Sequence, residues 1–95
     1  MHAVVRLYSG PGAGELFDLL ETRKREVEDL ISSVSGFRSY ILIKGPTGGA
    51  SVTVCETRFG TEESMKLARD WIVHNAYDLN LAAPTVADGE VILEA

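Results

Sequence analysis

The stretch from Phe37 to Glu56, FRSYILIKGPTGGASVTVCE, decides the fold of this chain. Aromatic and β-branched residues fill both of its ends, which is typical of β-strands. Between these ends, Gly45-Pro46-Thr47-Gly48-Gly49 is a strong turn signal. We therefore predict a strand over residues 37–44, a hairpin turn, and an antiparallel strand that returns over residues 50–58.

The same kinds of element flank this hairpin on both sides. Residues 3–8 read as a short strand, and residues 13–34 carry apolar side chains at helical spacing. Residues 61–79 form a second amphipathic helix, and a loop over residues 82–88 leads to a last strand over residues 89–94. This order predicts an α+β, ferredoxin-like βαββαβ fold, in which two helices cover one face of a four-stranded antiparallel sheet.

Length, charge and cysteine content limit the classes of protein that this chain can be. Its 95 residues suffice for a single domain, which we expect to span residues 1–95. The formal net charge of −5 argues against nucleic acid and anionic membranes as partners. No stretch resembles a signal peptide or a membrane span, so we expect a cytoplasmic protein. The single cysteine, Cys55, excludes an internal disulfide and is expected to be a small buried apolar residue.

Side-chain alternation along the strands divides the predicted sheet into two faces. The face toward the helices is expected to hold Val5, Leu7, Phe37, Ile41, Ile43, Val52, Val54, Val91 and Leu93. The outer face is expected to hold Val4, Arg6, Tyr8, Arg38, Tyr40, Leu42, Thr53, Cys55 and Ile92. This outer set mixes aliphatic, aromatic and cationic residues, as protein–protein interfaces do. We therefore predict a homodimer that forms through the outer sheet face.

Two segments carry a resemblance to a known family. They are Ser35-Gly36-Phe37-Arg38-Ser39-Tyr40 and residues 52–64, VTVCETRFGTEES, where a strand ends in a glutamate, a short turn and an acidic helix start. In these features the chain resembles the antibiotic-biosynthesis-monooxygenase-like domains of the dimeric α/β-barrel superfamily. The resemblance implies a homodimer with a pocket between sheet and helices in each subunit. Some members of that family oxidise polycyclic aromatic molecules with oxygen and without a cofactor.

The residues of the haem-degrading relatives do not transfer to this chain. Those relatives pair an asparagine on the first strand with a tryptophan and a histidine on the second helix. Here the first strand offers Arg6, and the second helix carries Trp71 with His74 only three residues further on. We therefore expect no haem and no other cofactor. A metal site is not expected either, because the two histidines lack clustered ligand spacing.

Five residues are candidates for a small-molecule pocket: Arg6, Arg23, Tyr40, Trp71 and His74. Arg23 projects from the apolar stripe of the first helix, where its stem covers apolar surface or its guanidinium enters the pocket and binds an anion. Trp71 lies at the edge of the second helical stripe, as a core anchor or as a ring stacked on a ligand. His74 lies further toward solvent and would need a partner to act as a base.

Two classes of function remain open at this point. The first is a monooxygenase-like enzyme that acts on a small aromatic molecule. The second is a non-catalytic binding or sensing module, because the Gly10–Gly14 loop resembles the Pro-Gly turn of ACT domains. That loop does not match a dinucleotide-binding fingerprint, whose third glycine would fall at Glu15. An enzyme would consume oxygen with its substrate, whereas a binding module would show only saturable stabilisation by ligand.

Overall fold

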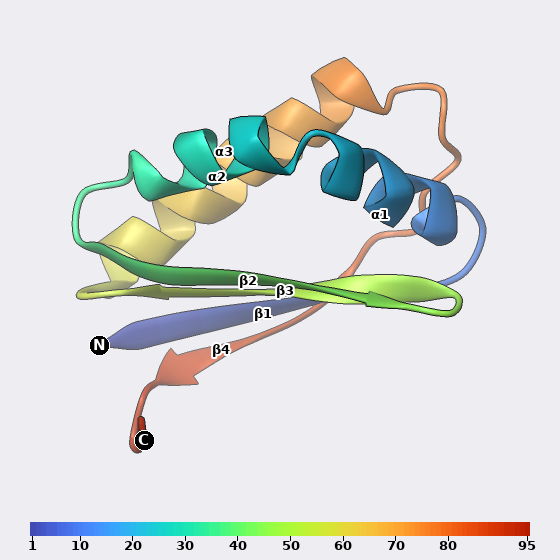
Figure 1. Ribbon diagram of the computed structural model, residues 1–95. Helices are drawn as coiled ribbons and strands as arrows, with labels where there is room; N and C mark the ends of the chain where they lie inside the picture. Colours follow the sequence, from blue (N-terminus) through green and yellow to red (C-terminus); the bar gives the residue numbers. More distant parts are fainter.

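The computed structural model describes residues 1–95 and has the predicted α+β, ferredoxin-like fold. Strands β1 (His2–Tyr8) and β3 (Gly48–Cys55) lie at the centre of one antiparallel sheet, and β2 (Phe37–Gly45) and β4 (Thr85–Glu90) lie at its edges. The strand order is β2-β3-β1-β4. Figure 1 shows all the helices layered on one face of this sheet, while no element covers the other face.

The helical layer differs from the prediction in its first element. The segment predicted as one helix over residues 13–34 is two helices, α1 (Ala13–Thr22) and α2 (Lys24–Ser32), separated at Arg23. Arg23 has a φ of −111° and a ψ of 29°, which lies outside the helical region. The break lets α1 pack over β3 while α2 packs over β2. None of the helices is long and apolar enough to cross a bilayer.

The last helix and the last strand begin earlier than predicted. Helix α3 (Arg58–Asn75) starts directly after the turn that follows β3, so the predicted strand over residues 50–58 runs too far. β4 pairs with β1 from Leu7↔Thr85 to His2↔Glu90, so the strand predicted over residues 89–94 starts four residues too late and overlaps the real one only at Gly89 and Glu90. Beyond Glu90, Val91 N still donates a hydrogen bond to Met1 O over 2.9 Å, but Ile92 is 93% exposed. Hydrophobicity misled the assignment because β4 is an exposed edge strand with few apolar residues.

The two sheet faces are the reverse of the predicted assignment. Val4, Arg6 and Tyr8 are buried beneath the helices, whereas Leu7 is 53% exposed on the opposite side. We call the first side the helix-covered face; strand pairing gives it Val4, Arg6, Tyr8, Tyr40, Leu42, Ser51, Thr53 and Cys55. The other side is the open face, which holds Ala3, Val5, Leu7, Ser39, Ile41, Ile43, Ala50, Val52, Val54, Thr85 and Ala87.

A β-bulge explains why the alternation in β2 misleads. Phe37 pairs with Cys55 and Ser39 with Val54, so one residue of β2 is left over between them. The bulge shifts the side-chain phase by one residue. Phe37 therefore packs toward the helices as predicted, but Tyr40 does so too, while Ile41 lies on the open face.

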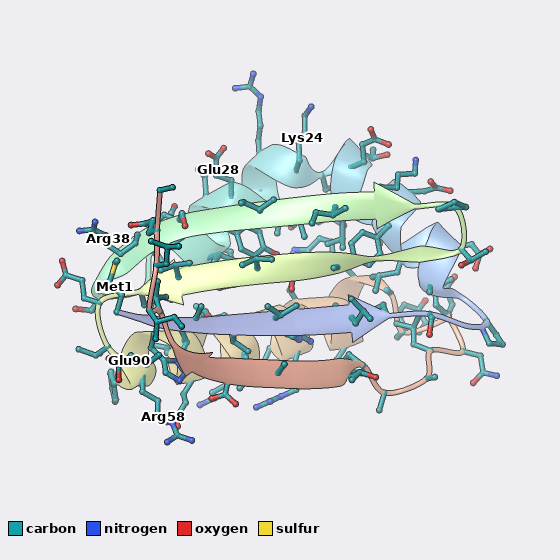
Figure 2. All side chains as sticks on the ribbon, turned by 90° about the horizontal axis from the view of Figure 1, so that it is seen from below. Met1, Lys24, Glu28, Arg38, Arg58 and Glu90 are labelled. Carbon is teal, nitrogen blue, oxygen red and sulfur yellow. The ribbon has the colours of Figure 1, made fainter.

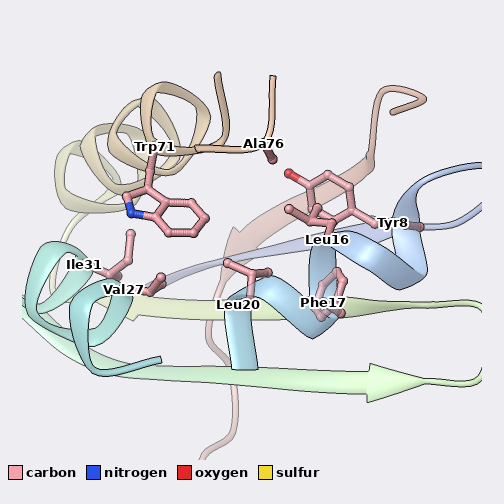
Figure 3. Packing of buried hydrophobic residues seen from close by; sticks show 9 residues of the cluster. Tyr8, Leu16, Phe17, Leu20, Val27, Ile31, Trp71 and Ala76 are labelled. Carbon is pink, nitrogen blue, oxygen red and sulfur yellow. The ribbon is translucent and has the colours of Figure 1, made fainter. Parts of the chain in front are cut away.

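The core fills the space between the helix-covered face and the helices. Figure 3 shows Leu20 of α1, Val27 and Ile31 of α2, and Trp71 of α3 converging on this interior. Close packing reaches the sheet backbone at Gly49, where a Cβ atom would lie 2.6 Å from the ring of Phe17. The same interior contains the cavity described next.

Candidate functional site

A narrow cavity lies between the helix-covered face and the helices. Thirteen residues line it, and 11 of them are hydrophobic. The sheet contributes Arg6, Tyr8, Tyr40, Leu42 and Ser51, and the remaining lining residues come from α1, α2 and α3. The cavity volume is about 20 Å³, which is room for one or two water molecules. A larger ligand therefore requires the walls to move.

Arg6 is the one charged side chain among the buried residues of the chain. It is 6% exposed, and it points from the central strand β1 toward the helices. Its Nη2 donates a hydrogen bond to the Tyr8 hydroxyl, and its Cζ lies 5.3 Å from the centroid of the Tyr8 ring. No ion pair of the structure includes Arg6.

Two phenols lie close enough to Arg6 for its charge to influence their pKa values. Burial raises the pKa of Tyr40 to about 12, although the charge of Arg6 opposes that shift. Burial also raises the pKa of Tyr8, again against the charge and the hydrogen bond of Arg6. Both phenols are therefore protonated at neutral pH, and each has an O–H group to donate.

Trp71 joins the cavity to a polar cluster between α2 and α3. Its indole Nε1 donates a hydrogen bond to Glu26 Oε2 over 2.7 Å. Arg23 Nη2 donates to the same carboxylate oxygen over 2.6 Å, and Arg23 Nη1 donates to Asn75 Oδ1 over 2.8 Å. The Arg23 guanidinium also lies over the Trp71 ring, with its Cζ 5.1 Å from the ring centroid. The hydrogen bonds from Arg23 and Trp71 lower the pKa of the Glu26 carboxyl.

The structure brings three of the five candidate residues together. Arg6, Tyr40 and Trp71 all line the cavity. Arg23 does not line it but holds the rim through Trp71 and Glu26. His74 lies apart on the exposed side of α3, where its Nδ1 is 2.7 Å from the backbone oxygen of Asp70.

Sequence reasoning missed Tyr8 and Ser51 as lining residues. The predicted assignment of the sheet faces was wrong and put Tyr8 on the outer side of the sheet, so neither residue was expected in the pocket. The two-residue alternation carries the missing signal, because Tyr8 follows Arg6 on one side of β1. Ser51 lies directly opposite Arg6 in the β1–β3 pairing.

Two further groups of reactive side chains do not form accessible sites. His2 Nδ1 lies 2.6 Å from Thr61 Oγ1, and His2 Nε2 lies 3.2 Å from Asp88 Oδ2. This hydroxyl–imidazole–carboxylate order is that of hydrolase triads, but Thr61 is only 1% exposed, so no substrate reaches its hydroxyl. Cys55 is fully buried, and burial raises the pKa of its thiol, which disfavours the nucleophilic thiolate. No three His, Cys, Asp or Glu side chains are grouped as metal ligands would be.

Comparison with known proteins gives likeness in structure alone. No family model matches the chain, and no curated protein matches it. A protein of unknown function from Nitrosomonas europaea is 20% identical, with a TM-score of 0.71 over 99% of this chain and 90% of that one. A dimeric ferredoxin-like protein from an uncultured marine organism is 12% identical, with a TM-score of 0.65 over 99% of this chain and 94% of that one.

A third solved structure bears on the family resemblance. It is a candidate antibiotic biosynthesis monooxygenase from Chloroflexus aurantiacus, 19% identical, with a TM-score of 0.64 over 99% of this chain and 95% of that one. At such identities the likeness shows the fold only. The resemblance to monooxygenase-like domains is thus confirmed at the level of the ferredoxin-like fold.

Proposed function

We propose that this protein binds a small, electron-rich aromatic molecule between the helix-covered face and the helices, and oxidises it with oxygen without a cofactor. The observation that carries the proposal is the cavity itself. Its walls are mostly apolar, yet Arg6, Tyr8, Tyr40 and Ser51, which carry polar groups, are among the residues that line it. Ligand sites in proteins have this character, with mostly hydrophobic walls and a few polar groups that fix orientation. The fold shared with candidate monooxygenases supports the oxidative reaction.

The proposed reaction needs only the substrate and oxygen. A ring methylene activated by a neighbouring phenol loses two hydrogens and gains one oxygen atom as a carbonyl. The second oxygen atom leaves with those two hydrogens as water, so one O2 is consumed for each ring that is oxidised. An apolar cavity favours such chemistry because it excludes water from the reactive intermediate.

Entry of an aromatic ring requires the rim of the cavity to open. The present volume of about 20 Å³ is too small for a ring. The contact that closes the rim joins α2 to α3 through Glu26 and Trp71, next to the helix break at Arg23. Separation of this contact would enlarge the cavity while the sheet stays in place.

Oxygen uptake tests the proposal. With 1,8-dihydroxyanthrone, whose ring methylene carries the two hydrogens that the reaction removes, we expect saturable uptake of one O2 per substrate, measured with an oxygen electrode. The rate should fall at least about tenfold in Tyr40→Phe and Trp71→Leu, because both side chains line the cavity. Tyr77→Phe is the matched control, since Tyr77 is 83% exposed and lies outside the cavity. Stabilisation by ligand without oxygen uptake would indicate a binding module. The absence of both stabilisation and uptake would refute the proposal.

The finer proposal for assembly is a homodimer that forms through the open face. This face is mostly aliphatic, with Ser39 and Thr85 as its polar members, and Leu7, Ile41 and Ile43 are each more than half exposed on it. Figure 2 shows that no helix covers this side and that the last residues of the chain extend across it from the end of β4. In that segment Ile92 and Leu93 are 93% and 84% exposed, so they do not pack on their own sheet. A second copy of the chain would bury both the face and the segment.

The ACT-like alternative gains no support from the fold. The Gly10–Gly14 loop, which suggested it, does not line the cavity. Instead, the loop leads into α1, where Leu16 N donates a hydrogen bond to Gly12 O over 2.9 Å. Its glycines serve the turn, because Gly10 and Gly12 both have a positive φ.

A further inference from the structure

We propose that the ligand of the cavity carries an oxyanion, a carboxylate or a phenolate, and that Arg6 binds this group as its counter-ion. The inference rests on the proposed function in one respect, because the same cavity holds the ligand. It adds the charge of the ligand and the residue that selects it.

The first argument is that Arg6 has no acidic side chain within ion-pair distance. A guanidinium keeps its charge in proteins, and burial of a charge without a partner is costly. Arg6 is 6% exposed, yet no carboxylate lies within 4.0 Å of it. No acidic residue lines the cavity either. The buried charge is thus left for a group that comes from outside.

The second argument concerns the donors of the guanidinium. Its one hydrogen bond goes from Nη2 to the Tyr8 hydroxyl. Nε and Nη1 donate no hydrogen bond. However, every fully buried side-chain nitrogen or oxygen atom of the structure has a hydrogen-bond partner. These two atoms therefore keep accessible surface, and the open space beside Arg6 is the cavity. Free guanidinium donors suit a carboxylate or a phenolate oxygen.

The third argument is the set of neutral donors around Arg6. The Tyr8 hydroxyl accepts from Arg6, so its own hydrogen is free for a ligand. Ser51 lies opposite Arg6 in the strand pairing, and Tyr40 lines the same cavity. Three hydroxyl groups and one guanidinium thus border a space without any acidic side chain. Such a set favours an anion over a neutral or cationic ligand.

Binding of 4-nitrophenol and 4-nitroanisole tests this proposal. The two molecules are similar in size, but only the phenol ionises. Binding is followed by quenching of Trp71, the single tryptophan of the chain, at a pH where free nitrophenol is largely ionised. We expect nitrophenolate to bind at least about tenfold more tightly than nitroanisole, as a charge-assisted hydrogen bond allows. The bound probe should also ionise at a lower pH than the free probe, by about one pH unit, which its absorbance shows without any variant.

Variants then assign the preference to Arg6. Arg6→Met should lose the preference for nitrophenolate while it still binds nitroanisole, and Arg6→Lys, which keeps the charge, should retain part of it. Arg25→Met is the matched control, because Arg25 is exposed on α2 and should leave both affinities unchanged.

The outcomes separate the two proposals. Equal binding of both probes to the wild-type protein would overturn the oxyanion site and leave the proposed function standing. A preference for nitrophenolate that survives in Arg6→Met would overturn the role of Arg6. Failure of both probes to bind would overturn this inference, whereas the proposed function is judged separately by the oxygen-uptake experiment. The pH at which the bound probe ionises tests the preference of the cavity for an oxyanion even if Arg6→Met does not fold.

Discussion

The two faces of the sheet differ in a way that reverses the usual pattern. The helix-covered face buries Arg6, Ser51 and Thr53 at exposures of 6% or less. The open face leaves Ile41 and Ile43 more than half exposed, although they are among the most hydrophobic residues of the chain. A monomeric sheet with one solvated face would place these two sets the other way round.

This difference indicates that the faces serve separate purposes. Aliphatic residues on the open face gain nothing from water, and the dimer proposed above would bury them. Polar residues on the helix-covered face cost desolvation, so they are explained by a ligand or by internal hydrogen bonds. The helices supply most of the apolar surface of the core, among it Leu16, Phe17 and Ile31, which leaves room for polar side chains on the sheet beneath them.

The largest expected effect comes from a charge at the centre of the open face. Val52 pairs with Val5 on one side and with Ile41 on the other. Val52→Glu should convert the proposed dimer to a monomer at micromolar concentration, because a dimer would bury the carboxylate unpaired at a cost of several kcal/mol. Light scattering measures the mass. Val73→Glu is the control, since Val73 is 65% exposed on α3 and its variant should stay dimeric. A monomeric wild-type protein would contradict the assignment of the open face.

The sequence was sufficient for the fold because local signals there agree. The Gly45–Gly49 turn does form the β2–β3 hairpin, whereas Gly36, at a φ of 79°, serves the turn into β2 and does not cap the helix, because α2 already ends at Ser32 with Ser33 as its C-cap. The break of the helical layer at Arg23 was not predicted, although every residue between Leu20 and Val27 is polar. The signals that were right depend on neighbours in the chain, so the order of the elements could be predicted.

The candidate site could be predicted only in part, because it depends on which sheet face the helices cover. Both faces of β1 carry apolar residues, so hydrophobicity does not show which face the helices cover. Val4 and Val5 are equally hydrophobic, yet only Val4 lies under the helices. The bulge between Phe37 and Ser39 then moves Tyr40 to the cavity side without a clear sequence signal. Arg6 and Tyr40 were named as candidates, but their convergence required the tertiary structure.

A smaller effect is expected from the phenol on the helix-covered face. The pKa of Tyr40 is about 12 in the folded protein, against 10.0 for an ordinary tyrosine. The unfolded chain therefore loses this proton first, and stability falls as the pH rises from 10 toward about 12. The free energy of unfolding falls by about 2 kcal/mol over this range. The Tyr40→Phe variant, which lacks the phenol, should not show this part of the fall.

Urea unfolding followed by Trp71 fluorescence at pH 8, 10 and 11 would measure the first part of that loss, about 1.4 kcal/mol at pH 11. Tyr77→Phe removes an exposed phenol and should keep the alkaline loss of the wild-type protein. If Tyr40→Phe lost stability as steeply as the wild-type protein, the phenol would not be held in its protonated form by burial. The helix-covered face would then be more open to water than its side-chain exposures indicate.

The smallest effect concerns the rim, where the helix-covered face meets solvent. Hydrogen bonds from Arg23 and Trp71 lower the pKa of Glu26, so its carboxylate stays ionised below the ordinary range of a glutamate. The contact is complete at neutral pH and is lost as the pH falls through that lowered value. Trp71 fluorescence should therefore change in acid before the protein unfolds, and Glu26→Gln should abolish this step. Glu28→Gln on the same helix should keep it, because Glu28 is exposed and has no bond to Trp71. An unchanged acid step in Glu26→Gln would mean that Glu26 does not hold the rim, and ligand entry would then have to be sought elsewhere along the cavity.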